Sequence, residues 1–142
     1  RLLDLGCGYG YLALCLYERG PCEVTATDNN AAAVRACGRN FGDRGMCGPV
    51  VPSDCGDILE GPYETIVCNP PFHRGFAVDG GLGERFLRAM HRLLHPDGAA
   101  WVVVNSFIPL GRRAAPWFEV VEPVCNDRQY TVYRLARPHP ER

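Results

Sequence analysis

Short apolar runs alternate along this chain with longer segments in which apolar residues recur at helical spacing. Apolar runs bounded by Gly, Pro, Asp or Asn predict buried strands, and the segments between them predict helices. The expected strands cover residues 2–5, 23–27, 49–52, 64–68 and 99–104, and the expected helices cover about 11–19, 31–40 and 83–95. This alternation favours right-handed β-α-β units, and therefore an α/β fold with a parallel sheet.

The end of the chain has a different pattern. Residues 111–116 show little periodicity, and two apolar runs follow at 118–124 and 129–135, joined through Asn126 and Asp127. Two strands with so short a connection predict an antiparallel hairpin, which we place at one edge of the sheet. The helix over residues 83–95 carries an apolar stripe that is expected to pack in the core: Phe86, Leu87, Met90, Leu93 and Leu94.

A glycine-rich turn lies between the first strand and the first helix. Gly6, Gly8 and Gly10 allow positive φ angles and a close approach of the backbone to a ligand, and the helix behind them offers free N–H groups. The spacing G-x-G-x-G departs from the dinucleotide fingerprint and lacks the P-loop lysine. Asp4, at the end of the strand, would repel a pyrophosphate. The turn therefore suits a nucleoside ligand that carries an ammonium group and no phosphates.

Asp28 follows the second strand, where a carboxylate can accept both hydroxyls of a ribose. Its plainer interpretation is a cap for the following helix, since Asp and Asn are favoured there. Asn29 and Asn30 suit that capping role better, because Asp28 lies one place nearer the strand.

The fourth strand runs into Asn69-Pro70-Pro71-Phe72. Two prolines cannot donate ladder hydrogen bonds and keep the preceding residues out of helical geometry, so the backbone leaves the sheet as a stiff extended turn. The turn presents one amide, two carbonyl acceptors and an aromatic ring. A Pro-rich connection without chemistry is the plainer interpretation, and an amino group on a flat ring is the ligand that these groups would fit.

Taken together, these elements resemble the class I S-adenosylmethionine-dependent methyltransferases that act on exocyclic amino or amide nitrogens. Further residues narrow the resemblance to ribosomal RNA guanine-N2 methyltransferases of the RsmC and RlmG type: His73-Arg74-Gly75, Asp79, Pro96-Asp97-Gly98, Asn105, Phe107, Pro109 and the segment 126–134. The resemblance implies a Rossmann-like fold with a seven-stranded sheet in the order 3-2-1-4-5-7-6, strand 7 antiparallel and helices on both faces.

The resemblance also implies a role for individual residues. S-adenosylmethionine would be bound by Asp4, Gly6, Gly8, Asp28, Asn29, Asp54 and Asn69. Methyl transfer to the amino nitrogen would depend on Asn69, Pro70 and Phe72. The substrate, ribosomal RNA or a ribosomal subunit, would contact Pro71, Phe72, His73 and Phe107.

Composition limits these interpretations. The chain has 142 residues, which fits one domain, and its net charge of −1 gives no general attraction to RNA, so a local patch or another part of the protein would have to hold it. Because the chain begins at Arg1, directly before a strand, we expect a fragment, and the resemblance implies that it is the catalytic part and lacks an upstream domain that helps to engage RNA. The eight cysteines include no C-x-x-C pair, which predicts neither a zinc site nor a disulfide framework and favours the cytoplasm. No segment has the length or apolarity of a membrane span.

Two alternatives stay open. One is an amino-group methyltransferase that acts on adenine N6 of nucleic acid or on a protein glutamine. The other is a non-catalytic, methyltransferase-like scaffold that binds RNA. Degenerate scaffolds lose the glycine turn or the Asn69-Pro70-Pro71-Phe72 segment, and this chain has both.

Overall fold

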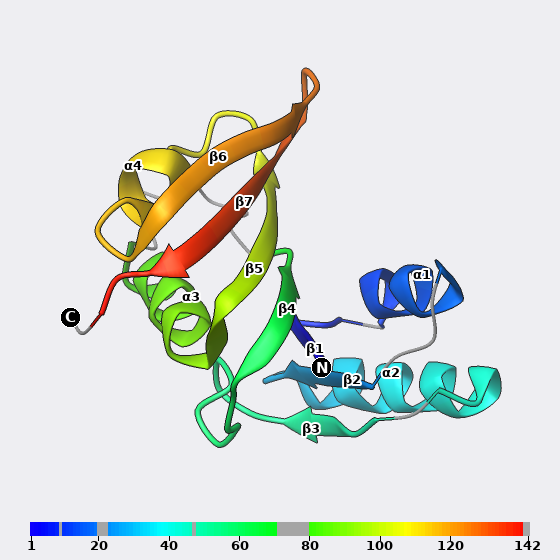
Figure 1. Cartoon of the computed structure of the whole chain (residues 1–142). Coiled ribbons are helices and arrows are strands. Elements are labelled where there is room, and N and C mark those ends of the chain that lie inside the picture. Colours follow the sequence, from blue (N-terminus) through cyan, green and yellow to red (C-terminus); the bar gives the residue numbers. More distant parts are fainter. Residues whose placement is uncertain (9, 20–22, 47, 71–79, 141–142) are drawn as a thin grey trace.

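The computed structural model describes residues 1–8, 10–19, 23–46, 48–70 and 80–140. Strands and helices alternate along most of it, and two strands close the chain (Figure 1). The elements are β1 Leu2–Leu5, α1 Tyr11–Arg19, β2 Val24–Asp28, α2 Ala31–Arg44, β3 Val50–Pro52, β4 Tyr63–Cys68, α3 Gly80–Leu93, β5 Leu94–Asn105, α4 Leu110–Ala114, β6 Phe118–Asn126 and β7 Tyr130–Pro138.

All seven strands form one sheet in the order β3-β2-β1-β4-β5-β7-β6, which confirms the predicted order. The pairs from β3 to β5 are parallel, and β7 runs antiparallel to both β5 and β6. The expected edge hairpin is therefore β6–β7. Because β1 is followed by β2 on one side and flanked by β4 on the other, the strand order reverses beside β1, which is where open α/β sheets bind ligands.

The sheet divides the core into two clusters. Leu3, Leu5 and Ile66 face α3 and α4 in the larger cluster, with Phe86 and Leu110 from those helices. The smaller cluster joins α1 and α2 to the other face: Leu2, Ala13, Val24, Ala26, Cys37, Phe41 and Val67. Figure 1 shows the same division, with α1 and α2 beside β1–β3 and with α3 and α4 on the opposite side. The predicted apolar stripe of α3 is buried in the larger cluster.

Several predicted boundaries were wrong. The helix expected to reach residue 95 ends at Leu93, and β5 begins at Leu94, which pairs with Tyr63. Pro96 disfavours helical geometry just before it, and Gly98 passes so close to β4 that a Cβ there would lie 2.5 Å from the Glu64 carbonyl oxygen. Residues 111–116 showed little periodicity in the sequence, yet residues 110–114 form α4, which is too short to show a helical period.

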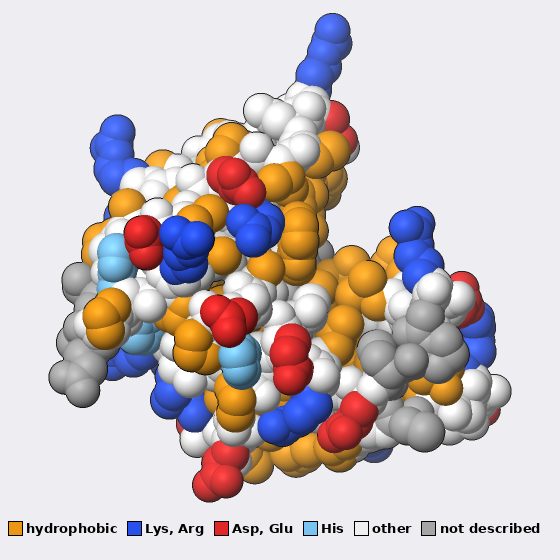
Figure 2. Space-filling model, viewed as in Figure 1, with side chains coloured by type: hydrophobic (Ala, Val, Ile, Leu, Met, Phe, Trp, Pro, Cys, Tyr) orange, Lys and Arg blue, Asp and Glu red, His pale blue; other side chains and the backbone are white. Residues whose placement is uncertain are grey.

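Charges of both signs are interspersed over the surface (Figure 2). Some of these charges form ion pairs, as Arg134 does with Glu122 and Arg137 with Glu119. No helix in the described part of the chain is both long and apolar enough to cross a membrane. Cys7, Cys15, Cys37, Cys55, Cys68 and Cys125 are free thiols.

Candidate active site

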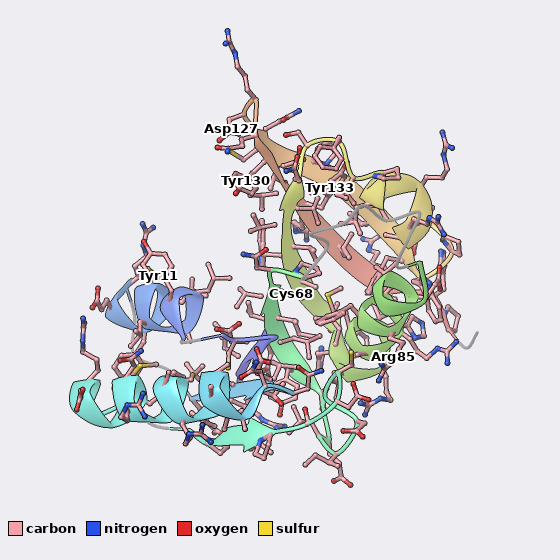
Figure 3. The ribbon with its side chains drawn as sticks, turned by 180° about the vertical axis from the view of Figure 1, so that it is seen from behind. Tyr11, Cys68, Arg85, Asp127, Tyr130 and Tyr133 are labelled. Atoms are coloured by element: carbon pink, nitrogen blue, oxygen red, sulfur yellow. The ribbon has the colours of Figure 1, made fainter. Side chains whose placement is uncertain are left out.

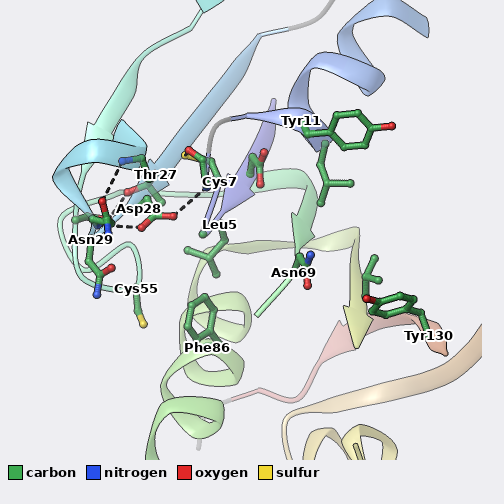
Figure 4. A pocket seen from close by; sticks show the side chains of 18 residues that line it. Leu5, Cys7, Tyr11, Thr27, Asp28, Asn29, Cys55, Asn69, Phe86 and Tyr130 are labelled. Atoms are coloured by element: carbon green, nitrogen blue, oxygen red, sulfur yellow. Dashed lines mark hydrogen bonds between the residues drawn. The ribbon is translucent and has the colours of Figure 1, made fainter. Parts of the chain in front are cut away.

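A cavity of about 800 Å³ lies at the carboxyl ends of the central strands (Figure 4). It is lined by Asp4 of β1 and the glycine turn that follows, by residues 27–30 at the end of β2 and just beyond it, by Ser53 and Cys55 after β3, and by Asn69 after β4. Tyr11, Leu12 and Ala33 of α1 and α2 contribute, as do Phe86 of α3, Val103 of β5 and Tyr130 of β7. The cavity therefore crosses the reversal point of the sheet and extends along it to β7.

The glycine turn is fixed to β2 by backbone hydrogen bonds. The amides of Gly6 and Cys7 both donate to the carbonyl of Thr27, at 2.9 and 2.8 Å. Gly8 and Gly10 have φ angles of +56° and +95°, which other residues rarely adopt. At Gly10 a Cβ would also lie 2.9 Å from the Sγ of Cys37, so glycine is needed where α1 begins against α2.

Asp4 is buried at the bottom of the cavity, with 1% of its surface exposed. Among the described residues, neither of its carboxylate oxygens has a hydrogen-bond partner, although the Ala13 amide lies near enough to lower the pKa in part. Burial is the largest influence and raises the pKa of Asp4 to about 7, and the Asp28 carboxylate adds to the rise. A buried acid without a partner is costly, and a cationic ligand group would remove that cost.

Asp28 lies at the end of β2 and is held by two backbone donors. The Gly8 amide donates to its Oδ2 and the Asn30 amide to its Oδ1, each at 2.9 Å. Each oxygen keeps a lone pair, so the half-exposed carboxylate is oriented toward the cavity as an acceptor for hydroxyl groups. The capping role belongs to Asn30, whose side chain accepts from the Ala33 amide at 3.0 Å. Asn29 lines the cavity beside it.

Asp54 is placed differently from its neighbours. Its carboxylate forms an ion pair with Arg85 of α3, whereas Ser53 and Cys55 line the cavity. The Ser53 hydroxyl contacts the Thr27 hydroxyl and accepts from the Gly56 amide at 3.0 Å, which fixes this loop to the end of β2. The predicted contact between Asp54 and the cofactor stays a prediction.

The Asn69 side chain lines the cavity at the end of β4, and Pro70 behind it is buried. In Figure 4 the amide lies between the end of β4 and Tyr130. Pro71, Phe72 and His73 lie outside the described residues, so their predicted contacts with the substrate stay predictions. Phe107, the fourth predicted substrate residue, is 72% exposed on the loop after β5 and does not line the cavity.

Phe86 and Tyr130 are among several cavity residues that were given no site role from the sequence. Phe86 was expected only in the core, yet its ring lies 3.4 Å from where a Cβ of Gly6 would be and forms part of the cavity wall. Its position in the first half of the helix that follows the Asn69 turn was the available signal. Tyr130 was noted only as part of the 126–134 segment, and its place at the start of a hairpin strand was the signal there.

The cavity cysteines are poor nucleophiles. The pKa of Cys7 is raised by its hydrogen bond with the Cys37 thiol and by burial. Burial also raises the pKa of Cys55. Because the thiolate is the reactive form, neither residue is suited to carry a covalent intermediate at neutral pH. The arrangement instead offers fixed acceptors: a buried carboxylate, an oriented carboxylate and an amide.

Comparison with known proteins gives a family and several relatives. The family model described as methyltransferase small domain matches residues 1–134. The ribosomal RNA small subunit methyltransferase C of Chromohalobacter salexigens is 38% identical over 137 residues, which are 96% of this chain and 41% of the relative. The protein of the same name from Shewanella amazonensis is 33% identical over 134 residues, or 94% of this chain and 39% of the relative.

A solved structure of the T. thermophilus 16S rRNA N2 G1207 methyltransferase (RsmC) in complex with AdoMet and guanosine has a similar fold. Its TM-score is 0.85 at 28% identity, and the match covers 96% of this chain and 37% of that one. The chain therefore spans about two fifths of the length of the relatives it matches.

Proposed function

Because the chain belongs to the methyltransferase small domain family, we propose that it transfers a methyl group from S-adenosylmethionine to guanine N2 of ribosomal RNA. The observation that carries this proposal is that one cavity holds the unpartnered Asp4 carboxylate, the oriented Asp28 carboxylate and the Asn69 amide. The first two acceptors fit the cofactor, and the third fits an amino group that receives the methyl.

The two carboxylates of the cavity suit S-adenosylmethionine, which carries an ammonium group and ribose hydroxyls. Asp4 would accept the ammonium of its methionine part, and Asp28 would accept the two ribose hydroxyls. The glycine turn gives the ligand room, since a Cβ at Gly8 would meet no atom within 4 Å, and Asn29 lies along the same wall. Asp54 is paired with Arg85 and does not line the cavity, so we assign the adenine end of the cavity first to Ser53 and Cys55.

The relatives support the choice of acceptor. The relatives from Chromohalobacter salexigens and Shewanella amazonensis, which match nearly all of this chain, are named as methyltransferases of ribosomal RNA. The similar solved structure is named for guanine N2 and contains guanosine. An adenine or glutamine acceptor would use the same Asn69 acceptors and is therefore the second candidate, which the experiment below separates.

The chain's own residues would make the amino nitrogen a better nucleophile. Bound S-adenosylmethionine supplies a methyl group on a cationic sulfur, which is already a good leaving group. The Asn69 side-chain oxygen and the Pro70 carbonyl would accept hydrogen bonds from the two amino hydrogens, which keeps electron density on the nitrogen. The nitrogen lone pair forms the new bond to carbon, the carbon–sulfur pair returns to sulfur, and one amino proton leaves to water.

Phe72, Pro71 and His73 would complete the substrate side. We propose that Phe72 stacks on the extruded base, as enzymes that act on bases generally require, and that Pro71 shapes the turn beneath it. His73 would contact RNA, and so would Phe107, which is exposed outside the cavity. These contacts position the base and add no general base to the mechanism.

The test is methyl transfer from labelled S-adenosylmethionine by the purified protein. Naked ribosomal RNA, assembled ribosomal subunits, DNA and release-factor protein are offered in parallel, and labelled RNA is digested to nucleosides. We expect label only in N2-methylguanosine. Label in N6-methyladenosine or in protein would replace guanine N2 with the second candidate, and a lack of cofactor binding by calorimetry would refute the enzyme proposal.

Asn69→Ala tests the catalytic assignment in the same assay. We expect transfer to fall by at least about 100-fold while the Kd for S-adenosylmethionine changes by less than about threefold, since the lost acceptor acts on the amino group. Asn69→Asp is the matched control, because it keeps an acceptor oxygen at the same place and should retain more activity than Asn69→Ala. Equal activity of Asn69→Ala and the wild type would remove Asn69 from the mechanism.

A further inference from the structure

Tyr130 lies at the end of the cavity that is farthest from β3. It is the first residue of β7 and pairs with Asn105, the last residue of β5. It therefore lies, like Asn69, at the end of the sheet where the parallel strands have their carboxyl ends. Its side chain is 47% exposed and nevertheless lines the cavity together with Val103 and Asn69. Figure 4 shows its ring reaching from β7 toward the Asn69 amide.

The backbone of Tyr130 is held more firmly than its exposure suggests. The Oδ1 atom of Asp127 accepts from the amides of Gln129 and Tyr130, both at 2.7 Å, and the Asp127 amide donates to the Tyr130 carbonyl at 3.0 Å. These bonds lower the pKa of Asp127, so its carboxylate stays ionised at neutral pH. Figure 3 shows Asp127 and Tyr130 together at this end of the hairpin, across from Tyr11 of α1.

The hairpin is also tied to the loop after β5. The Ser106 amide donates to the Gln129 carbonyl at 2.9 Å, and the Ser106 hydroxyl donates to the Asp127 carbonyl at 3.1 Å. A large aromatic side chain on a fixed backbone loses little freedom when it binds a flat ring. Tyr133, on the same strand, is different: it packs against the larger core cluster.

The acceptors in the cavity are arranged in order along the sheet. Asp28 and Ser53 lie at the β2–β3 end, Asp4 lies at β1, and Asn69 lies at β4. If the cofactor occupies the part between β3 and β1, the acceptor group must lie beyond Asn69, because transfer needs the two reactants on opposite sides of the methyl group. The walls described there are Val103 and the ring of Tyr130.

We propose that Tyr130 is a substrate-binding residue whose ring contacts the face of the acceptor base beside Asn69. The inference rests on the proposed function and adds to it the residue that binds the base on the β7 side. Val103 supplies the apolar floor, and the hydrogen bonds of Asp127 keep the ring in place before the substrate arrives.

The test is the kinetics of methyl transfer to the RNA acceptor by wild type, Tyr130→Ala and Tyr130→Phe. Loss of base–aromatic stacking predicts that Tyr130→Ala raises the KM for the acceptor by about 10- to 100-fold and leaves the Kd for S-adenosylmethionine within about twofold. Tyr130→Phe keeps the ring and should stay within about threefold of wild type. Val124→Ala, at an exposed position of the same hairpin, controls for changes in folding and should leave both constants unchanged.

The outcomes separate the two proposals. If wild type transfers methyl groups and Tyr130→Ala keeps the wild-type KM, the role of Tyr130 is overturned and the proposed function stands. Equal losses in Tyr130→Ala and Tyr130→Phe would overturn the ring contact, and a parallel loss of cofactor affinity would show a structural role instead. If wild type transfers nothing, the proposed function fails. The binding of guanosine is then measured with S-adenosylhomocysteine present, and equal affinities of wild type and Tyr130→Ala would overturn the inference as well.

Discussion

At the end of β1, Asp4 combines a cost to folding with a proposed gain in ligand binding. The carboxylate is buried without a hydrogen-bond partner among the residues the structure describes, and its pKa is raised to about 7 from the ordinary 3.8. The folded protein binds the proton of the Asp4 carboxyl more tightly than the unfolded chain does. Protonation of Asp4 therefore stabilises the fold fully below about pH 3.8, and this stabilisation is lost as the pH rises through 7. Ionisation of Asp4 prepares the site for a cation at the expense of stability.

We therefore expect the ligand-free protein to lose stability with rising pH. Between about pH 5 and pH 8 the free energy of unfolding should fall by about 2–3 kcal/mol through Asp4 alone. Asp4→Asn should remove this dependence and be the more stable form at about pH 8, while binding S-adenosylmethionine at least about tenfold more weakly. Urea unfolding at several pH values and calorimetry measure the two effects, with Asp43→Asn as the control at an exposed position. A fall in stability at pH 8 on Asp4→Asn would contradict the assignment.

A second prediction concerns the glycine turn, where alanine should have different effects at Gly8 and at Gly10. Gly10→Ala brings a Cβ to 2.9 Å from the Cys37 Sγ at a φ of +95°, so we expect a loss of about 2–4 kcal/mol in the free energy of unfolding. Gly8→Ala adds a Cβ that meets nothing within 4 Å and should cost about 1 kcal/mol. Because that Cβ lies at the cavity, Gly8→Ala should weaken cofactor binding more than folding. Thermal unfolding of both variants measures the two losses of stability, and calorimetry measures cofactor binding. A larger loss of stability in Gly8→Ala than in Gly10→Ala would contradict the prediction.

Chemistry at the strand ends could be read from the sequence, but the direction of each side chain could not. Asp4 lies near the end of an apolar run, Asp28 and Asn69 follow such runs, and the sheet brings all three to the cavity as expected. Asp54 was equally well placed in the sequence, yet the loop turns at Cys55, with a φ of +51°, and Asp54 pairs with Arg85. No local pattern encodes that turn.

At the scale of elements, α2 shows how much of a helix is set by its ends. Asn30 caps its first turn, and Gly45 ends it at a φ of +62°, with its amide donating to the Gly42 carbonyl at 3.2 Å. The helix was expected to end near residue 40, whereas the observed one continues to Arg44 and includes Gly38 and Gly42. Tertiary packing of Cys37 and Phe41 outweighs the low helix propensity of these glycines.

Gly38 is therefore a position where helix propensity can be gained. Its φ lies outside the left-handed region, and a Cβ there would meet no atom within 4 Å. We expect Gly38→Ala to raise the free energy of unfolding by about 0.5–1 kcal/mol, equivalent to about 2–4 °C in Tm. Gly45→Ala, at the left-handed cap, should lower it by about 1 kcal/mol. Calorimetric melting of both variants tests this pair, and stabilisation by Gly45→Ala would show that the cap geometry does not matter.

At the scale of the whole molecule, alternation of strands and helices predicted a parallel sheet, but it did not give the order of the strands. That order came from the family resemblance, because the direction in which each crossover returns depends on non-local packing and not on local pattern. Val103 and Tyr130, for example, lie 27 positions apart in the sequence and meet only because β7 pairs antiparallel to β5. The wall of the cavity formed by Val103 and Tyr130 is accordingly the part that the sequence did not indicate.

The order of groups along the sheet predicts that two ligands protect different parts of the molecule. S-adenosylhomocysteine should slow amide hydrogen exchange in the glycine turn and in residues 53–56, since these line the cavity between β3 and β1. Residues 103–106 and 127–131 should respond only when guanosine is added, because Tyr130 and Val103 lie beyond Asn69. At about 100 times its Kd, S-adenosylhomocysteine should also stabilise the whole fold by about 2.7 kcal/mol. Exchange measured by mass spectrometry with each ligand alone and with both tests this division, and protection of residues 127–131 by S-adenosylhomocysteine alone would place the cofactor, not the base, against Tyr130.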